Sequence, residues 1–227
     1  LLPMTRLHIM FFILLFPALS VIGQAVSEND FDHYSIESGL SNNAVSGIAQ
    51  DKRGYIWIAT ASGLNRFNGS RFVQYRSNDD SLSVPAEGIS SLAWLDKHRL
   101  GVLTSGLHII DTRTGRTHNL FIPYHTRQYA FKFNMIERVI GEENGDIYVL
   151  SRSGFYHYDK NYHLLSRFDY YSEAEVPIEH FFWGRELFEL DSNLLLITTI
   201  NGLYIYDKRK RKVKKMAPAD CPVMAEL

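Results

Sequence analysis

A glycine followed by a large apolar residue recurs four times at nearly regular spacing in this chain of 227 residues. The four are Gly63, Gly106, Gly154 and Gly202, which lie 43, 48 and 48 residues apart. An Asn or Asp stands five residues after each glycine, at positions 68, 111, 159 and 207. Because such a pattern marks repeated structural units, the chain is expected to contain about four copies of one unit.

The first repeat contains four short runs of β-branched and aromatic residues separated by turn formers. These runs predict strands over residues 45–50, 55–60, 64–67 and 71–75. The Asn68-Gly69 pair is typical of a two-residue hairpin turn, in which the backbone needs a positive φ. A period of about 40 to 50 residues with four strands per unit predicts an all-β fold, a β-propeller of four-stranded antiparallel blades.

The repeats divide the chain into a leading segment, four blades and a tail. Residues 45–216 are assigned to the blades, over residues 45–83, 84–128, 129–178 and 179–216. In the leading segment, residues 26–44, Phe31 to Tyr34 repeats the Phe-x-x-Tyr spacing of residues 72–75 and is predicted as a ring-closing outer strand. Residues 217–227 are interpreted as the tail of a truncated chain. The propeller is therefore predicted to be incomplete.

Residues 1–25 have the features of a cleavable signal peptide. Arg6 lies in a short basic start, and an apolar run from Ile9 to Ile22 follows. This run is shorter than the roughly 20 residues that cross a bilayer, but it suits the apolar region of a signal peptide. Cleavage is predicted after Ala25, with an uncleaved anchor as the alternative. The remaining chain is expected to be exported.

The first repeat closely resembles the propeller repeat of bacterial two-component regulators. The matching segments are residues 39–45 (GLSNNAV), 50–60 (QDKRGYIWIAT) and 63–69 (GLNRFNG), whereas the later repeats keep the Gly and Asp positions but lose the tryptophan. The resemblance implies the periplasmic sensor region of a hybrid histidine kinase, which recognises oligosaccharides and regulates genes of polysaccharide utilisation. It also implies that further propeller blades and a membrane-coupled kinase region are partners of this chain. The resemblance is compatible with a homodimer. No kinase motif lies in these residues, so this part of the protein is expected not to be an enzyme.

The amino-acid composition argues against several other classes of function. With 24 Lys+Arg against 25 Asp+Glu, the formal charge of -1 gives no bulk attraction to nucleic acid, and no nucleic-acid contact is expected. The single cysteine, Cys221, cannot close an intramolecular disulfide or supply a zinc site. A dense basic run at residues 208–215 is interpreted as a solvated strand edge, with a polyanion contact as the alternative.

Catalytic and metal-binding motifs are not found. The nearest histidine pairs lack Cys or carboxylate ligands at a recognised spacing, so neither a metal nor a cofactor is expected. These pairs are His108/His118, His118/His125 and His157/His163. Four aspartates could suggest acid-base chemistry, but their place in turns favours a structural role; they are Asp51, Asp111, Asp159 and Asp207.

Propeller geometry places one set of loops around the central opening, namely those entering each first strand and those between second and third strands. On that face we expect polar groups beside an aromatic platform, which suits a sugar ring. The candidate ligand-binding residues are Asn42, Asn43, Ser62, Glu87, Asn134, Arg152, His180, Trp183 and Asn201. Trp183 is the first choice, with packing between blades as the alternative, whereas Trp57 and Trp94 are expected in the core.

Two other functions remain open. A propeller enzyme such as a lyase would need a histidine and a metal on the loop face, where His180 is the one obvious candidate. A scaffold that binds protein is the other alternative. The fold alone does not separate them, because one propeller hosts many functions.

Overall fold

The computed structural model describes residues 31–75, 88–120, 135–169 and 183–216. The chain divides into two compact units, residues 1–33 and 34–227, and the described strands all belong to the second. The predicted signal peptide and the tail at residues 217–227 lie outside the described residues.

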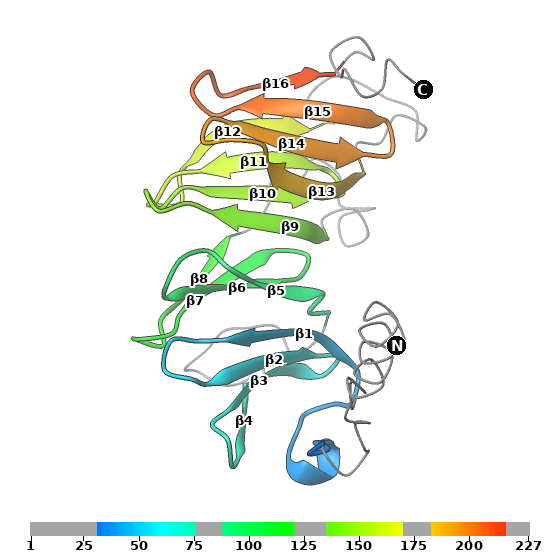
Figure 1. Ribbon diagram of the computed structural model, residues 1–227, viewed down its shortest axis with the longest axis vertical. Coiled ribbons are helices and arrows are strands. Elements are labelled where there is room, and N and C mark those ends of the chain that lie inside the picture. Colours follow the sequence, from blue (N-terminus) through cyan, green and yellow to red (C-terminus); the bar gives the residue numbers. More distant parts are fainter. Residues whose placement is uncertain (1–30, 76–87, 121–134, 170–182, 217–227) are drawn as a thin grey trace, which may run out of the picture. The chain divides into compact units, whose positions relative to one another are not determined.

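The described residues form sixteen strands in four antiparallel sheets, joined in the order of the sequence (Figure 1). The first sheet holds β1 (Val45–Gln50), β2 (Ile56–Thr60), β3 (Gly63–Phe67) and β4 (Phe72–Tyr75). The second holds β5 (Ser91–Trp94), β6 (Arg99–Leu103), β7 (Leu107–Asp111) and β8 (Thr117–Leu120). The third holds β9 (Ile136–Gly141), β10 (Ile147–Ser151), β11 (Gly154–Tyr158) and β12 (Leu164–Asp169). The fourth holds β13 (Gly184–Glu189), β14 (Leu194–Thr199), β15 (Gly202–Asp207) and β16 (Lys212–Lys215).

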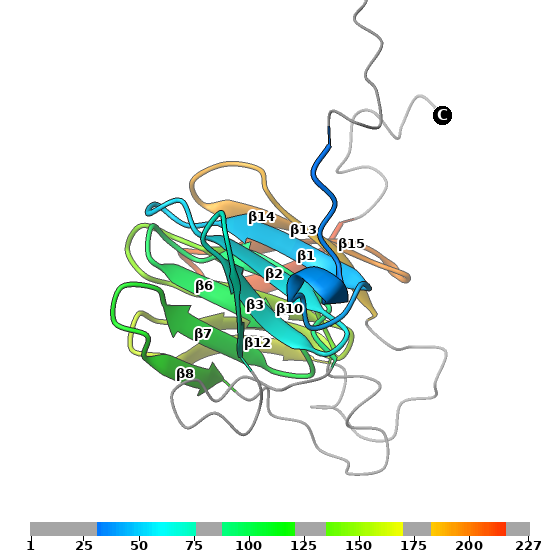
Figure 2. The same cartoon turned by 90° about the horizontal axis from the view of Figure 1, so that it is seen from below.

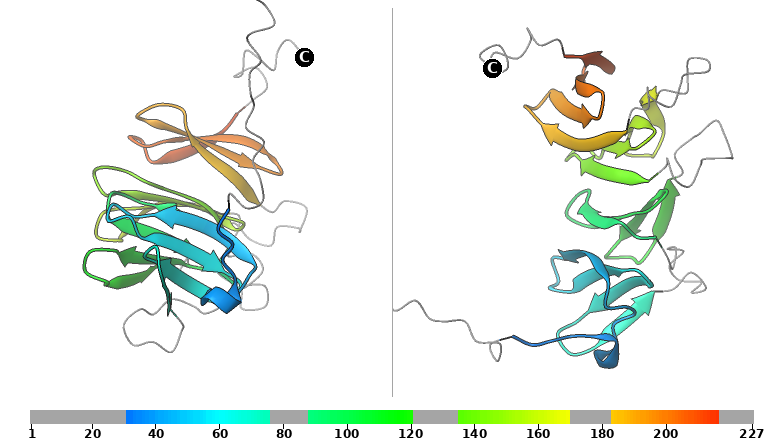
Figure 3. Two further views of the ribbon diagram at one scale, coloured as in Figure 1. Left: turned by 60° about the horizontal axis from the view of Figure 1, so that its bottom comes forward. Right: turned by 90° about the vertical axis from the view of Figure 1, so that its right-hand side faces the viewer.

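Each sheet is an up-and-down blade, so the predicted all-β fold of four-stranded antiparallel blades is confirmed. The first strands of successive blades contact one another, from β1 through β5 and β9 to β13. Figure 2 views the blades along the direction in which they follow one another. The described blades do not close into a ring (Figure 3), as expected of an incomplete propeller.

Three apolar cores lie between neighbouring blades. In the first, Trp57 and Leu64 of blade one pack with Leu100 of blade two. Equivalent clusters join blades two and three, and blades three and four. Each blade buries apolar residues toward its neighbour, which is how a stack of small sheets gains a continuous core. Trp57 is 2% exposed, and the partly buried Trp94 packs against the same cluster, so the expected core role of both is confirmed.

The repeated Asn and Asp residues shape the hairpins between third and fourth strands. Asn68 Oδ1 accepts hydrogen bonds from the backbone N–H groups of Ser70 and Arg71, at 3.0 and 2.9 Å. Asp111, Asp159 and Asp207 each accept backbone N–H groups in the corresponding turns. Asp51 does the same between β1 and β2. The structural role predicted for these aspartates is confirmed, because their oxygens replace the backbone partners that a turn leaves open.

One local prediction needs correction. The predicted two-residue turn at Asn68-Gly69 is a longer connection between Phe67 and Phe72, and Gly69 supplies its left-handed residue with φ +94°. The hydrogen bonds that the Asn68 side chain accepts close this turn. The mirror-image turn type that is typical of a two-residue hairpin is therefore not required. Residues 31–34 are assigned no strand, and the last blade of a ring, with which they were predicted to pair, is not among the described residues. The ring-closing role stays a prediction.

Candidate functional site at the blade junctions

Six of the nine predicted ligand-binding residues are described, and Glu87, Asn134 and His180 lie outside the described residues. The described six fall into two groups and one separate residue. Asn42, Asn43 and Ser62 belong to blade one, whereas Arg152 and Trp183 meet where blade three adjoins blade four. Asn201 stands in the turn between β14 and β15, where its backbone N–H donates to Thr199 Oγ1 at 3.0 Å.

The blade-one residues Asn42, Asn43 and Ser62 show whether the loop entering the first strand lies beside the turn between the second and third strands, as predicted. Asn42, before β1, donates from Nδ2 to Ser62 Oγ at 3.0 Å, and Ser62 lies between β2 and β3. The loop entering the first strand therefore contacts the second-to-third turn. Asn42 Oδ1 also accepts the N–H of Ala44, and Asn43 Oδ1 accepts that of Ile36. These amides are therefore engaged in holding their own loop.

The junction of blades three and four joins three loop segments through one residue, Arg152. Its backbone N–H donates to Met135 O at 3.1 Å, and its own carbonyl accepts the N–H of Trp183 at 3.0 Å. Its side-chain Nε donates to Glu137 Oε1 at 2.5 Å. The guanidinium carbon lies 5.7 Å from the centre of the Trp183 ring, within the range of a cation–π contact. Arg152 and Trp183 thus form a polar and aromatic pair.

Trp183 has a backbone conformation that is unusual for its residue type. Its φ is +38°, in the left-handed region that a bulky side chain adopts at a cost of about 1–3 kcal/mol. The next residue, Gly184, is wedged against blade three, since an added Cβ would lie 2.6 Å from Leu150 Cδ1 and from Ser151 O. The two blades therefore approach closely at the residue that follows Trp183.

A serine or threonine closes the same turn in every blade, a feature that the sequence analysis missed. Thr60, Thr104, Ser151 and Thr199 each accept an N–H of the turn and donate to the carbonyl of the repeated glycine. A hydroxyl residue two or three positions before each repeated glycine was the available signal. These residues hold the loop face on which the candidate ligand-binding residues stand.

Two hollows lie on the opposite face of the blades. A pocket of about 870 Å³ opens between blades two and three. It is lined by residues of first-to-second and third-to-fourth turns, namely Leu95, Asp96, Lys97, His98, Arg99, Asp111, Arg113, Gly141, Glu142 and Glu143. A second pocket of about 460 Å³ lies between blades three and four and includes Glu142, Glu189 and Lys208. Neither pocket was predicted from the sequence, because the lining residues come together only when blades adjoin.

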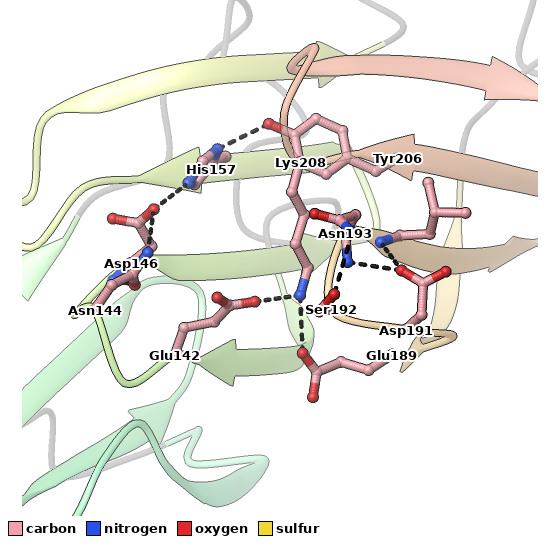
Figure 4. Close-up of polar contacts among 11 residues, drawn as sticks. Glu142, Asn144, Asp146, His157, Glu189, Asp191, Ser192, Asn193, Tyr206 and Lys208 are labelled. Atoms are coloured by element: carbon pink, nitrogen blue, oxygen red, sulfur yellow. Dashed lines mark hydrogen bonds and ion pairs between the residues drawn. The ribbon is translucent and has the colours of Figure 1, made fainter.

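Lys208 joins blades three and four beside the smaller pocket (Figure 4). Its side chain is 8% exposed, and its Nζ contacts Glu142 Oε1 of blade three and Glu189 Oε1 of blade four, the latter at 2.8 Å. Burial disfavours the ammonium charge, but the hydrogen bonds with the two carboxylates outweigh it and raise the pKa of Lys208. The first residue of the basic run is therefore a structural link.

A second polar link between the same blades runs through His157. Its Nδ1 lies 2.8 Å from Tyr206 Oη of blade four, and its Nε2 lies 3.2 Å from Asp146 Oδ2 (Figure 4). Burial lowers the pKa of His157, against the opposing effect of Asp146. The ring is therefore neutral at pH 7, with Tyr206 donating to Nδ1 and Nε2 donating to Asp146.

The histidines His108 and His118 contact residues that are not metal ligands, His108 within blade two and His118 across to blade three. His108 bonds to Asn119 at 2.8 Å and Thr104 at 3.2 Å, and His118 stacks on Tyr162. Over the described ranges, three or more His, Cys, Asp or Glu side chains do not gather in an arrangement that could hold a metal ion. Nor does the described part of the chain contain a helix of the length and apolar character needed to cross a membrane.

Comparison with known proteins links the first repeat to one family. Residues 39–62 match the model of the two-component regulator propeller. A curated relative, histidine kinase P4 of Formosa agariphila, is 40% identical over 76 residues, which cover 33% of this chain and 6% of the relative. The chain therefore spans only a small fraction of that protein.

Solved structures resemble the chain in fold. An extracellular domain assigned to a hybrid two-component system of B. thetaiotaomicron aligns with TM-score 0.59 and 24% identity, over 82% of this chain and 26% of that one. Virginiamycin B lyase of Staphylococcus aureus aligns with TM-score 0.55 and 13% identity, over 76% and 55%. At these identities the likeness shows the fold alone. This chain therefore carries a two-component regulator propeller repeat, at residues 39–62, within a β-propeller fold.

Proposed function

We propose that this chain is part of the exported, ligand-sensing propeller region of a hybrid two-component signalling protein and that it recognises an oligosaccharide. The family match at residues 39–62 and the kinase relative support the signalling part. The pairing of Arg152 with Trp183 carries the proposal about the ligand. On this proposal, ligand binding regulates genes of polysaccharide utilisation from the periplasm.

The chemistry of the Arg152–Trp183 pair suits a sugar. An indole ring offers a flat apolar surface to the C–H face of a pyranose, while the guanidinium and the Glu137 carboxylate offer donors and acceptors to its hydroxyl groups. The left-handed backbone of Trp183 supports a functional role, because strained residues cluster at binding sites. The alternative, packing between blades, predicts a loss of stability rather than of affinity on truncation.

The position of the pair also supports a signalling role. Arg152 belongs to blade three and Trp183 leads into blade four, so a ligand contacting both biases how the two blades adjoin. A ligand shifts a conformational equilibrium only by its difference in affinity for the two states. The bias would pass to further blades, to a partner protomer and to the membrane-coupled kinase region, which are the proposed partners.

A thermal-shift screen with neutral oligosaccharides tests the proposal. A ligand present at about 100 times its Kd stabilises the folded chain by about 2.7 kcal/mol and raises its Tm. Trp183→Ala is expected to weaken binding at least roughly tenfold, and Arg152→Gln to weaken it less. Tyr34→Ala, at an aromatic side chain of the leading segment that is 45% exposed, is the matched control.

The outcomes separate the three functions. If no oligosaccharide raises the Tm, or if Trp183→Ala binds as the parent chain does, the sugar-sensing proposal fails. Turnover of an added substrate by the purified chain would favour the enzyme. Binding of a protein partner with no effect from any glycan would favour the scaffold.

A further inference from the structure

We infer that the pocket between blades two and three is a second binding site, which takes a short peptide by its two charged ends. The pocket measures about 870 Å³. Its walls are the β5–β6 and β7–β8 turns of blade two and the β9–β10 turn of blade three. It lies on the face opposite the Arg152–Trp183 pair, so its ligand is distinct from the oligosaccharide proposed above.

Both walls of the pocket lie within the stack of blades. Blade two packs against blades one and three, and blade three packs against blades two and four, through the three apolar cores. Leu95 lines the pocket and is also a member of the core between blades two and three, where it is 1% exposed. The pocket is therefore a hollow at a packed junction. Its volume falls within the range of about 300–1,000 Å³ that small-molecule sites have.

The turns at this pocket differ from those at the other two blade junctions. Between blades one and two, Arg53 of the β1–β2 turn donates to the carbonyl of Thr112 in the β7–β8 turn. Between blades three and four, Lys208 contacts Glu142 of the β9–β10 turn. Lys97 corresponds to Arg53, because each stands two residues after the start of a turn that is closed by the same backbone hydrogen bond. The Lys97 ammonium, however, lines the pocket and contacts no partner among the described residues.

Most other charges in the lining are already paired. Arg99 Nε donates to Asp96 Oδ2 at 2.6 Å, and Arg113 pairs with Asp111 at 3.2 Å. Arg99 also links the two blades, because its Nη2 donates to Gly145 O at 3.2 Å. These pairs hold the walls in place and leave few charges for a ligand.

Two unpaired charges of opposite sign remain, one on each blade. Lys97 of blade two and Glu143 of blade three are both exposed, and neither forms an ion pair with a residue that the structure describes. The half-buried His98 adds an imidazole on the side of blade two. A carboxylate is thus complementary to Lys97 and His98, and an ammonium is complementary to Glu143. A neutral sugar would leave both charges without a partner.

The size of the pocket favours a peptide over a single amino acid. A space of this volume is roughly 10 Å across, which is the length of about three extended residues. The charged ends of a tripeptide therefore reach Lys97 on one blade and Glu143 on the other.

NMR titration of the ¹⁵N-labelled 227-residue chain tests this inference with tri-alanine as the probe. Shifts are expected at residues 95–99 and 141–143. Lys97→Gln and Glu143→Gln should each weaken binding roughly tenfold, because each removes one hydrogen bond to a charged group. The matched control, Lys52→Gln, removes the exposed lysine of the equivalent turn in blade one.

Capped peptides show which end each residue binds. N-acetyl-tri-alanine lacks the ammonium, so Lys97→Gln should weaken its binding and Glu143→Gln should leave it unchanged. Tri-alanine amide lacks the carboxylate and should give the reverse. The inference is overturned if residues 95–99 do not shift, if the doubly capped peptide or maltotriose binds there as well as tri-alanine, or if Lys52→Gln causes an equal loss. Trp183→Ala should leave tri-alanine binding intact, which separates this site from the proposed oligosaccharide site.

Discussion

The indole Nε1–H of Trp57 donates a hydrogen bond of 3.2 Å to Asp51 Oδ2 inside blade one. The other carboxylate oxygen of Asp51 accepts the backbone N–H groups of Arg53 and Tyr55, at 2.9 and 3.0 Å. Both side chains are buried. One carboxylate thus shapes the turn between β1 and β2 and also accepts the hydrogen bond of the buried indole N–H.

Asp51→Ala is expected to lower the free energy of unfolding by about 2–4 kcal/mol, because it leaves a buried indole N–H without a partner and opens the turn. Urea denaturation of the parent and the variant measures this. Asp191→Ala is the control, since Asp191 accepts the equivalent turn N–H groups of blade four and contacts no indole. A loss no larger than that of the control would show that the indole bond contributes nothing.

Gly141 allows blades two and three to touch. A Cβ added there would lie 2.0 Å from Leu95 O, so Gly141→Ala must push the blades apart. We expect a loss of about 2–4 kcal/mol in the free energy of unfolding. Gly115→Ala, where an added Cβ meets nothing within 4 Å, carries only the strain of its φ of +71° and should cost about 1–2 kcal/mol. Equal losses would contradict the predicted clash.

The contact between Lys208 and Glu142 is expected to couple blades three and four. A double-mutant cycle with Lys208→Met and Glu142→Gln should give an interaction energy of about 1–2 kcal/mol, because the lysine side chain is 8% exposed. The cycle is measured by urea denaturation at low and high salt. The exposed pair Lys210–Asp207 is the matched control for salt sensitivity, and additive single effects at Lys208 and Glu142 would refute the coupling.

Stability is expected to fall as the pH drops below about 6.5. Burial lowers the pKa of His157 and of His108 below the ordinary value of 6.5, so the unfolded chain binds more protons than the folded chain in that range. Above pH 6.5 the two neutral rings make their full contribution to the free energy of unfolding. This contribution is lost progressively as the pH falls toward their lower folded-state pKa values. Denaturation curves at several pH values measure the slope.

Replacing either histidine should flatten this slope. His157→Gln and His108→Gln remove one titrating group each and are compared with His163→Gln, at a side chain that is 75% exposed. If the slope of the His157→Gln variant equals that of the parent chain, proton uptake at His157 does not control the pH dependence.

The fold was predictable from the sequence because its signals are local and repeated. The Gly at 63, 106, 154 and 202 and the Asn or Asp five residues later mark the same turns in each blade, where short-range hydrogen bonds decide the backbone. The prediction of the Asn68-Gly69 hairpin was wrong in detail, since the Asn68 side chain itself closes a longer turn.

The candidate site was less predictable. Arg152 and Trp183 were both chosen from propeller geometry, but their contact with each other and with Glu137 depends on how blades three and four adjoin. Their role in ligand binding stays a prediction, as does that of Asn42, Asn43, Ser62 and Asn201. The two pockets on the opposite face carry no mark in the sequence, since their walls combine turns of two neighbouring blades.

The sequence by itself determined the repeat, the four strands of each blade and the turn residues that separate them, because each depends on contacts within a few residues. Only the tertiary structure decided which side chains of different blades meet. Lys208 shows the difference: the sequence places it in a solvated basic run, whereas the packing of blade four on blade three buries it between two carboxylates. Contacts across a blade junction depend on the fit of two sheets, and no local pattern records that fit.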